Sequence, residues 1–200
     1  MTTFDERAPE WDTPEHVDRA LGIARTIREA VPLTPATRVL ELGAGTGLLG
    51  LALASEVGSL VLADASAGML AVADGKIEAV GLAHVSTLRL ELTVDPLPAE
   101  RFDLVVSLLA LHHVRDTAAA FKALGELLDP GGWLAIVDLD TEDGTFHTDP
   151  DAPVHHGLDR EHLTRIARAS GFADIAFRTA FEITKNARAY PLFLLTATRA

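Results

Sequence analysis

The sequence predicts an α/β protein built on a doubly wound, mainly parallel sheet. Short apolar runs typical of buried strands alternate with runs of helical periodicity from residue 38 to about residue 175. A glycine-rich turn follows the first of these strands, at the kind of position where open α/β sheets bind ligands. The chain has 200 residues, enough for one stable domain, and contains no cysteine. Disulfides, zinc–thiolate sites and cysteine nucleophiles are therefore excluded.

The order of elements follows from periodicity and from residues that break helices and strands. Strands are predicted over 38–42, 59–63, 85–92, 101–109, 133–138, 175–183 and 191–198. Helices are predicted over 14–31, 48–55, 67–80, 117–128 and 159–170. Asp159 is the expected N-cap of the last helix, and Gly171 follows its end. No composition break divides the chain, so one domain is predicted.

The charge of the chain argues against several classes of partner. Asp and Glu total 29 against 17 Lys and Arg, giving a formal net charge of −12. Such a chain is a poor electrostatic partner for phosphate backbones or anionic lipid. The N-terminal residues are polar and acidic, unlike a targeting segment, and no apolar run reaches the ~20 residues that a membrane helix needs. We therefore expect a cytoplasmic protein with a small-molecule substrate, no nucleic-acid partner and no membrane contact.

The strongest local signal is the run of three glycines that follows the strand over 38–42. Gly43, Gly45 and Gly47 allow the backbone to turn tightly and approach a ligand, and the next helix begins with free amide donors. A phosphate-binding Walker loop is excluded because no Lys-Ser/Thr pair follows the last glycine. The dinucleotide pattern fits only in a frame shifted to Gly45, two residues late. Asp64 ends the second strand, where a carboxylate can accept the hydroxyls of an adenosine ribose.

Four motifs in order resemble the class I S-adenosylmethionine-dependent methyltransferases. Residues 41–47, Glu-Leu-Gly-Ala-Gly-Thr-Gly, match the first motif of that family, and residues 64–70 match the second. Residues 102–105 with 111–114 resemble its fourth strand and exit, and residues 128–134 match its Pro-Gly-Gly turn. The chain is most similar to the small bacterial branch near the ubiquinone and menaquinone methyltransferases. The resemblance implies a Rossmann-like, seven-stranded sheet whose last strand runs antiparallel.

The resemblance also implies the cofactor, S-adenosyl-L-methionine, and the residues that hold it. Those residues are Glu41, Gly43, Ala44, Gly45, Gly47, Asp64, Ala65, Met69, Glu91, Leu92, Leu108 and Leu109. Within the single domain 1–200 it implies an N-terminal helical cap over 1–37 and a cofactor-binding core over 38–138. A substrate loop follows over 139–158, and a C-terminal helix with two strands over 159–200. The N-terminal tyrosine common in such enzymes is missing, and Phe4, Trp11 or His16 is expected to cover the pocket instead.

Histidines supply the candidate bases for methyl transfer to an ionisable acceptor. His112 and His113 follow the fourth strand at the ligand-binding edge, and either can deprotonate an acceptor or serve as a structural cap. His147, His155 and His156 crowd the loop over 139–158 with several carboxylates, but their spacing fits no metal motif, so no metal is predicted. His16, His84 and His162 are expected to be structural.

Methyl transfer from S-adenosyl-L-methionine to a small-molecule acceptor is the function expected from these residues. Two alternatives stay open at the level of sequence. The shifted glycine frame allows a nicotinamide-dependent oxidoreductase, and a non-catalytic adenosyl-binding regulatory module has the same binding motifs. The acceptor atom and the oligomeric state are not predicted.

Overall fold

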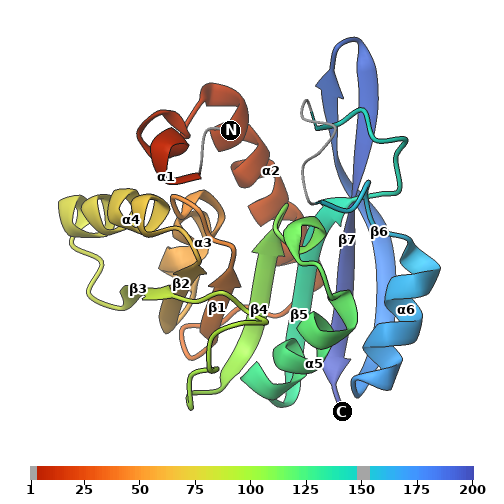
Figure 1. Ribbon diagram of the computed structural model, residues 1–200. Helices are drawn as coiled ribbons and strands as arrows, with labels where there is room; N and C mark the ends of the chain where they lie inside the picture. The colour runs from red at the N-terminus through yellow and green to blue at the C-terminus, as the bar shows by residue number, and fades with distance from the viewer. Residues whose placement is uncertain (1–3, 148–153) are drawn as a thin grey trace.

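A computed structural model describes residues 4–147 and 154–200 and has seven strands in one sheet (Figure 1). The order across the sheet is β3-β2-β1-β4-β5-β7-β6. Pairing is parallel from β3 to β5, and β7 runs antiparallel to both of its neighbours. The mainly parallel, doubly wound sheet with an antiparallel last strand is therefore confirmed. Among the described residues, no helix is both long and apolar enough to cross a bilayer.

The strands and helices alternate along the chain as predicted. The strands are β1 (Arg38–Leu42), β2 (Ser59–Asp64), β3 (Val85–Arg89), β4 (Phe102–Leu108), β5 (Leu128–Leu139), β6 (Phe172–Lys185) and β7 (Arg188–Arg199). The helices are α1 (Phe4–Arg7), α2 (Pro14–Ala30), α3 (Leu48–Leu53), α4 (Ala67–Val80), α5 (Thr117–Leu127) and α6 (Arg160–Ala169). Three single turns of 3-10 helix are η1 (Ala8–Glu10), η2 (Ala54–Glu56) and η3 (Leu111–His113).

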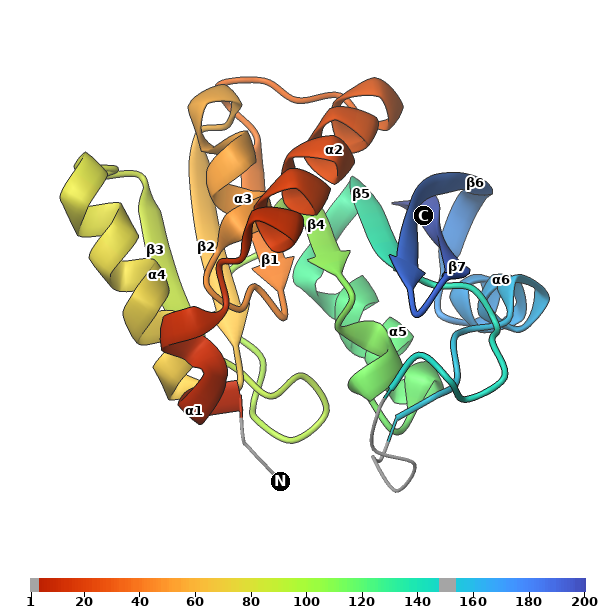
Figure 2. The same cartoon turned by 90° about the horizontal axis from the view of Figure 1, so that it is seen from above.

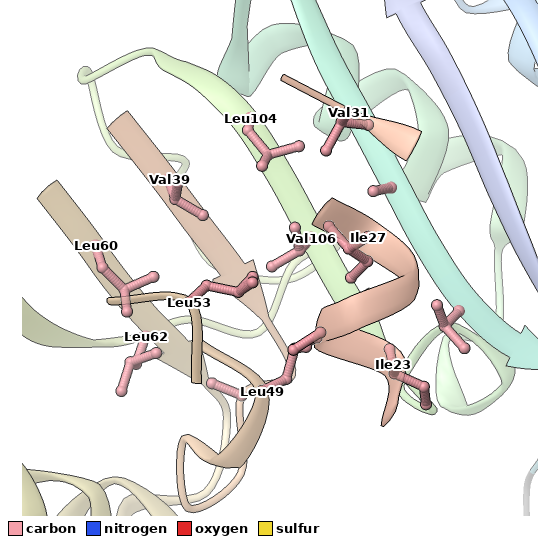
Figure 3. Packing of buried hydrophobic residues seen from close by; sticks show 14 of the residues in the cluster. Ile23, Ile27, Val31, Val39, Leu49, Leu53, Leu60, Leu62, Leu104 and Val106 are labelled. Atoms are coloured by element: carbon pink, nitrogen blue, oxygen red, sulfur yellow. The ribbon is translucent and has the colours of Figure 1, made fainter. Parts of the chain in front are cut away.

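Alternating side chains of the central strands build two separate cores. Val39 of β1 and Leu104 of β4 face α2 and α3, where Ile23, Ile27 and Leu49 are almost fully buried (Figure 3). The next residues in these strands face the opposite side, where α5 and α6 pack. Figure 2 shows α2 and α3 on one face of the sheet and α5 and α6 on the other. Because these strands are buried on both faces, most of their residues are apolar.

The third and fifth strands each differ by several residues from the boundaries that the sequence predicts. The strand expected over 85–92 ends at Arg89, because the side chain of Asp95 accepts the Glu91 amide and turns the chain. The fifth strand starts at 128 rather than 133, and residues 129–132 form an irregularity between its pairs with β4. In that irregularity the Asp129 carboxylate binds Arg38 at 2.6 Å.

The last two strands are longer than the predicted strands over 175–183 and 191–198. They continue until a hairpin turn at Asn186 and Ala187, whose φ angles are +53° and +59°. A two-residue hairpin of this kind needs positive φ at both positions and normally contains glycine at the second. Because residue 187 is alanine and not glycine, the sequence pattern does not indicate this turn.

Candidate functional site

The glycine loop joins β1 to α3 at the carboxyl edge of the sheet. Gly43, Gly45 and Gly47 all have positive φ, between +54° and +79°. A β-carbon on Gly43 would lie 2.2 Å from the β-carbon of Ala110, so only glycine fits against the segment that leaves β4. The Ala44 amide donates to Ala63 O at 3.0 Å and ties the loop to β2. The loop is thus held in one conformation between two neighbouring strand ends.

Asp64 lies beside this loop at the end of β2, as the sequence predicts. Its Oδ2 accepts the Gly45 amide at 2.7 Å, and its Oδ1 accepts the Ser66 amide at 2.8 Å. The carboxylate is half-buried, so each oxygen keeps lone pairs for a further donor. The geometry leaves Asp64 able to accept hydroxyl groups next to the glycine loop.

Glu41 is buried directly beneath the loop. Its Oε2 accepts the Gly50 amide at 2.8 Å from the first turns of α3, and the residue is 2% exposed. Burial raises the pKa of Glu41 to about 8, an effect that the Gly50 amide partly offsets and the nearby Asp64 reinforces. The structure therefore gives Glu41 direct geometry for orienting the glycine loop.

The remaining residues expected around the cofactor lie in three places near the glycine loop and Asp64, except for Leu92. Ala65 and Glu91 line an open hollow of about 440 Å³ with Arg89, Asp95 and Pro96. Met69 lies next to the glycine loop, with its sulfur 3.9 Å from where a Gly45 β-carbon would be. Leu108 and Leu109 are half-buried at the end of β4, and Leu109 has a φ of +53°. Leu92 instead belongs to the core on the α5 face.

Residues 4–12, which we call the strap, run between the first turn of α4 and the glycine loop. Asp12 accepts the Thr46 hydroxyl at 2.5 Å and pairs with Lys76, whose Nζ also donates to Thr46 O at 2.9 Å. At the other end of the strap, Asp5 accepts the Gly68 amide at 2.8 Å and so binds the first turn of α4. The strap is therefore attached by charged groups to both elements that flank Asp64.

Aromatic rings of the strap and of α2 lie over the site. The Trp11 ring is 4.9 Å from the His16 ring and 5.9 Å from Phe4, measured between centroids. Trp11 Nε1 would be 3.8 Å from a β-carbon on Gly45. Phe4 also meets His113 edge-on at 5.5 Å. All three residues expected to cover the pocket thus form one aromatic group, which links the glycine loop to the histidines.

His112 and His113 occupy different environments although they are adjacent in η3. His112 is 2% exposed, and its Nδ1 lies 2.6 Å from Oδ1 of Asp138, a fully buried residue of β5. The His112 backbone amide also donates to Asp138 at 3.1 Å. His113 keeps an exposed edge, yet the protein around its ring, with His112 and His147 beside it, lowers its pKa to about 4. His113 is therefore neutral at neutral pH.

A third histidine, His147, completes this cluster from the loop after β5. Its ring centroid lies 5.2 Å from that of His112 and 5.6 Å from that of His113. Burial, the neighbouring His112 and then Lys185 lower the pKa of His147, while Glu142 opposes them. The Nε2 atoms of His112 and His147 are buried and make no hydrogen bond to any residue that the structure describes. Within the described residues, no three histidines or carboxylates are arranged to hold a metal.

The other histidines have structural contacts. His155 Nε2 lies 3.0 Å from Val114 O, and its amide donates to His112 O at 2.8 Å, so His155 binds η3 and the residue after it. His84 Nε2 contacts Ala54 O at 2.8 Å, and the His162 amide is capped by Asp159 at 2.6 Å. The expected N-cap of α6 is therefore confirmed. Residues 148–153 of the predicted substrate loop, including Asp149, lie outside the described residues.

Comparison with known proteins assigns the part of the chain that carries this site. The family described as "Methyltransferase domain" matches residues 39–132. Residues 39–132 belong to the methyltransferase-domain family. The match runs from β1 through the glycine loop and Asp64 to the irregularity in β5, so it contains every residue expected to hold the cofactor.

The chain is similar in sequence to two bacterial proteins that are named as methyltransferases. An uncharacterized methyltransferase of Mycobacterium bovis is 37% identical over 112 residues, which cover 54% of this chain and 55% of that protein. The match therefore spans only about half the length of that relative. The demethylmenaquinone methyltransferase of Mycolicibacterium gilvum is 29% identical over 180 residues, covering 77% of this chain and 76% of that protein.

The fold of the chain is also that of solved methyltransferases. A crystal structure described as a SAM-dependent methyltransferase from Aquifex aeolicus superposes with a TM-score of 0.73. The superposition covers 98% of both chains at 20% sequence identity. The similarity of fold therefore extends beyond residues 39–132. It includes the N-terminal part of the chain and the β6–β7 hairpin.

Several residues of the site escaped the sequence analysis. Asp5, Asp12 and Lys76 bind the strap, and Asp138 binds His112, yet none of them stands in a motif with a recognisable spacing. Lone charged residues in helices and loops look like solvated surface. For Asp138, a signal was present, because it is a carboxylate at the end of an apolar strand.

The strap should depend on Asp12. Asp12→Ala removes an acceptor from Thr46 and a partner from Lys76, contacts worth roughly 1–2 kcal/mol together. We expect amide hydrogen exchange in residues 8–12 to become about five- to thirtyfold faster, which is the factor that this free energy represents. Glu10→Ala, an exposed carboxylate in the same strap, is the matched control and should leave exchange unchanged. Equal exchange in both variants would show that Asp12 does not hold the strap.

Proposed function

We propose that this chain transfers a methyl group from S-adenosyl-L-methionine to a small-molecule acceptor. The observation that carries the proposal is the contact between the Gly45 amide and Asp64, which sets a carboxylate beside a glycine loop at adjoining strand ends. A ligand with vicinal hydroxyls and a polar amino-acid tail fits the acceptor groups of Asp64 and the close backbone approach at the glycines. The methyltransferase domain of residues 39–132 and the cofactor named for the Aquifex structure support this choice.

The chain's own residues would hold the cofactor as follows. Asp64 accepts the ribose hydroxyls, and the loop of Gly43, Ala44, Gly45 and Gly47 lies under the sugar and the methionine portion. The adenine side is formed by Ala65, Met69 and Glu91. Leu92, in the core of the α5 face, supports that wall from behind. Leu108 and Leu109 close the side next to β4.

The reaction is a displacement in which one bond breaks and one forms. When bound, the cofactor supplies an electrophilic methyl group on a sulfonium sulfur. The acceptor atom forms a bond to the methyl carbon as the carbon–sulfur bond breaks, and S-adenosylhomocysteine leaves with that electron pair. A proton on the acceptor is released to a base or to water. Alignment of the two reactants and exclusion of water account for most of the rate, and the strap and its aromatic rings serve this exclusion.

A small acceptor fits the charge and the scale of this site better than a polymer. The net charge of −12 opposes the approach of a nucleic acid. In the histidine cluster beside Ala110, the rings of His112, His113 and His147 lie against one another, and Phe4 lies against His113. His112 and His113 both stand on this acceptor side, so the candidates for a catalytic role remain these two residues.

Calorimetric titration with S-adenosyl-L-methionine, S-adenosylhomocysteine and NAD tests the proposal. We expect both adenosyl ligands to bind and NAD not to bind. Asp64→Ala should weaken adenosyl binding by about 100-fold or more, since two hydrogen bonds to a charged group contribute roughly 3 kcal/mol. Asp18→Ala, which removes an exposed carboxylate of α2, is the control and should bind as the wild type does.

Each other outcome of the titration has a defined meaning. Binding of NAD in place of the adenosyl ligands would favour the oxidoreductase alternative. That alternative requires the first glycine of its pattern at the strand end, which is Gly43, and in this frame Leu48 replaces the third glycine. Adenosyl binding that Asp64→Ala leaves unchanged would contradict the role of Asp64.

A further inference from the structure

Asp138 and His112 form a buried carboxylate–imidazole pair that cofactor binding does not require. Asp138 is fully buried. Its oxygens accept two backbone N–H groups, the His112 amide at 3.1 Å and the Leu139 amide at 2.7 Å, and its Oδ1 lies 2.6 Å from His112 Nδ1. A buried carboxylate is costly unless it is fully hydrogen-bonded. This arrangement fixes the position of the imidazole by both its ring and its backbone.

The same hydrogen bonds define which ring nitrogen is basic. An ionised carboxylate only accepts hydrogen bonds, so Nδ1 of His112 carries the proton and Nε2 keeps its lone pair. That Nε2 atom is buried and has no hydrogen-bond partner among residues 4–147 and 154–200. Unpartnered buried acceptors are rare in proteins and call for an explanation such as a catalytic role. His112 is therefore an oriented base whose Nε2 lone pair no described residue uses.

The position of this base relates it to the proposed methyl donor site. His112 follows Ala110 by two residues, and Ala110 touches the glycine loop at Gly43. The ionisable groups that face its ring are Asp138 from β5, His113 from η3 and His147 from the loop after β5. Lys185 and Glu142 act on His147 in turn. Because His113 has a pKa of about 4, it is neutral and too weak a base to compete.

The surroundings of His112 indicate the shape of the acceptor. His113 and His147 lie against its ring, Phe4 lies against His113, and Phe146 meets His147 edge-on with centroids 5.1 Å apart. Rings of this kind pack best against a planar group. A planar, phenol-like acceptor would present an acidic O–H to Nε2 while its ring contacts these side chains.

We infer that His112 is the catalytic base of the proposed methyl transfer, that Asp138 is its positioning residue, and that the acceptor is a phenol-like O–H compound. In the reaction, the O–H proton moves to Nε2 and the phenolate oxygen takes the methyl group, while Asp138 stabilises the imidazolium that forms. The inference rests on the proposed function, since it presupposes a methyl donor beside Gly43.

The tautomer of His112 gives a first test that needs neither cofactor nor acceptor. NMR spectra that correlate the ring nitrogens with the ring protons should show the His112 proton on Nδ1 at neutral pH, with Nε2 bare. The wild-type protein suffices, so the test stands even if a variant at Asp138 does not fold. A proton found on Nε2 of His112 would overturn the inference.

Binding of 4-nitrophenol with saturating S-adenosylhomocysteine gives the second test, because the phenolate of this probe is coloured. We expect the wild type to ionise the bound probe below the pH at which the free probe ionises. The ratio of phenolate to phenol should be about tenfold lower in Asp138→Asn and in His112→Gln. His162→Gln, an exposed histidine of α6 outside the site, is the control and should retain the wild-type ratio and its pH profile.

The results separate this inference from the function on which it rests. Calorimetry with S-adenosylhomocysteine on the same proteins reports the cofactor site alone, and all variants should bind it equally. If the wild type binds no S-adenosylhomocysteine, the proposed function fails. If it binds S-adenosylhomocysteine but ionises no 4-nitrophenol, or if the ratio is unchanged in both Asp138→Asn and His112→Gln, the inference is wrong and the pair is structural.

Discussion

Gly43→Ala is expected to abolish binding of S-adenosyl-L-methionine and to lower the free energy of unfolding by roughly 2–5 kcal/mol. Two costs add at this position. The backbone has a φ of +65°, a region that alanine adopts only with strain, and the new β-carbon would lie 2.2 Å from that of Ala110. The collision moves the glycine loop away from the end of β4, where the methyl donor is proposed to lie.

Gly81→Ala is the matched control for this change. Gly81 has a similar φ of +72° at the end of α4, but no atom of the described residues outside its own turn lies within 4 Å of the position that a β-carbon would take. This variant should lose about 1 kcal/mol and bind the ligand normally. Urea unfolding and calorimetric titration of both proteins supply the measurement. Equal destabilisation by the two variants would mean that the contact with Ala110 adapts without cost.

Glu41→Gln is expected to remove a large part of the pH dependence of stability. Burial raises the pKa of Glu41 to about 8 in the folded protein, above its ordinary 4.5. The folded state therefore holds a proton that the unfolded chain releases, so stability is full below about pH 4.5 and falls as the pH rises to about 8. The shift corresponds to a loss of several kcal/mol, at most about 5 kcal/mol.

The measurement is the free energy of unfolding of wild type and Glu41→Gln between pH 5 and pH 8, taken as a difference at each pH. His113 acts in the opposite direction, since its lowered pKa of about 4 makes stability rise with pH up to about 6.5, so the window above pH 6.5 reports Glu41 most directly. Glu126→Gln, an exposed carboxylate of α5, is the control. A difference that does not change with pH would mean that Glu41 is ionised in the folded protein.

Most of the architecture could be predicted from local patterns. Strands buried on both faces, such as β1 and β4, are mostly apolar runs of a distinct length. Glycine at positions with positive φ marks the loop after β1 directly, because few other residues adopt that conformation. The end of β3 was wrong in the sequence prediction, since the turn depends on a hydrogen bond from the Glu91 amide to the Asp95 side chain.

Part of the candidate site could likewise be predicted from the sequence, and part could not. Gly43, Gly45 and Asp64 are tied to strand ends, so the topology of a parallel sheet brings them together once the strand order is known. His112 and His113 were indistinguishable as neighbours in the sequence. The structure separates them, because Asp138 lies on the adjacent strand β5 and hydrogen-bonds only one of the two rings.

The sequence by itself determined the class of sheet, the glycine loop and the carboxylate at the end of β2, since each is encoded within a few consecutive residues. Only the tertiary structure decided that Asp12 fastens the strap to Thr46, that Glu41 is buried against Gly50, and that Asp138 orients His112. These contacts join polar residues from different elements of the fold. Their energies depend on burial and on distances of a few ångströms, which no periodicity in the sequence records.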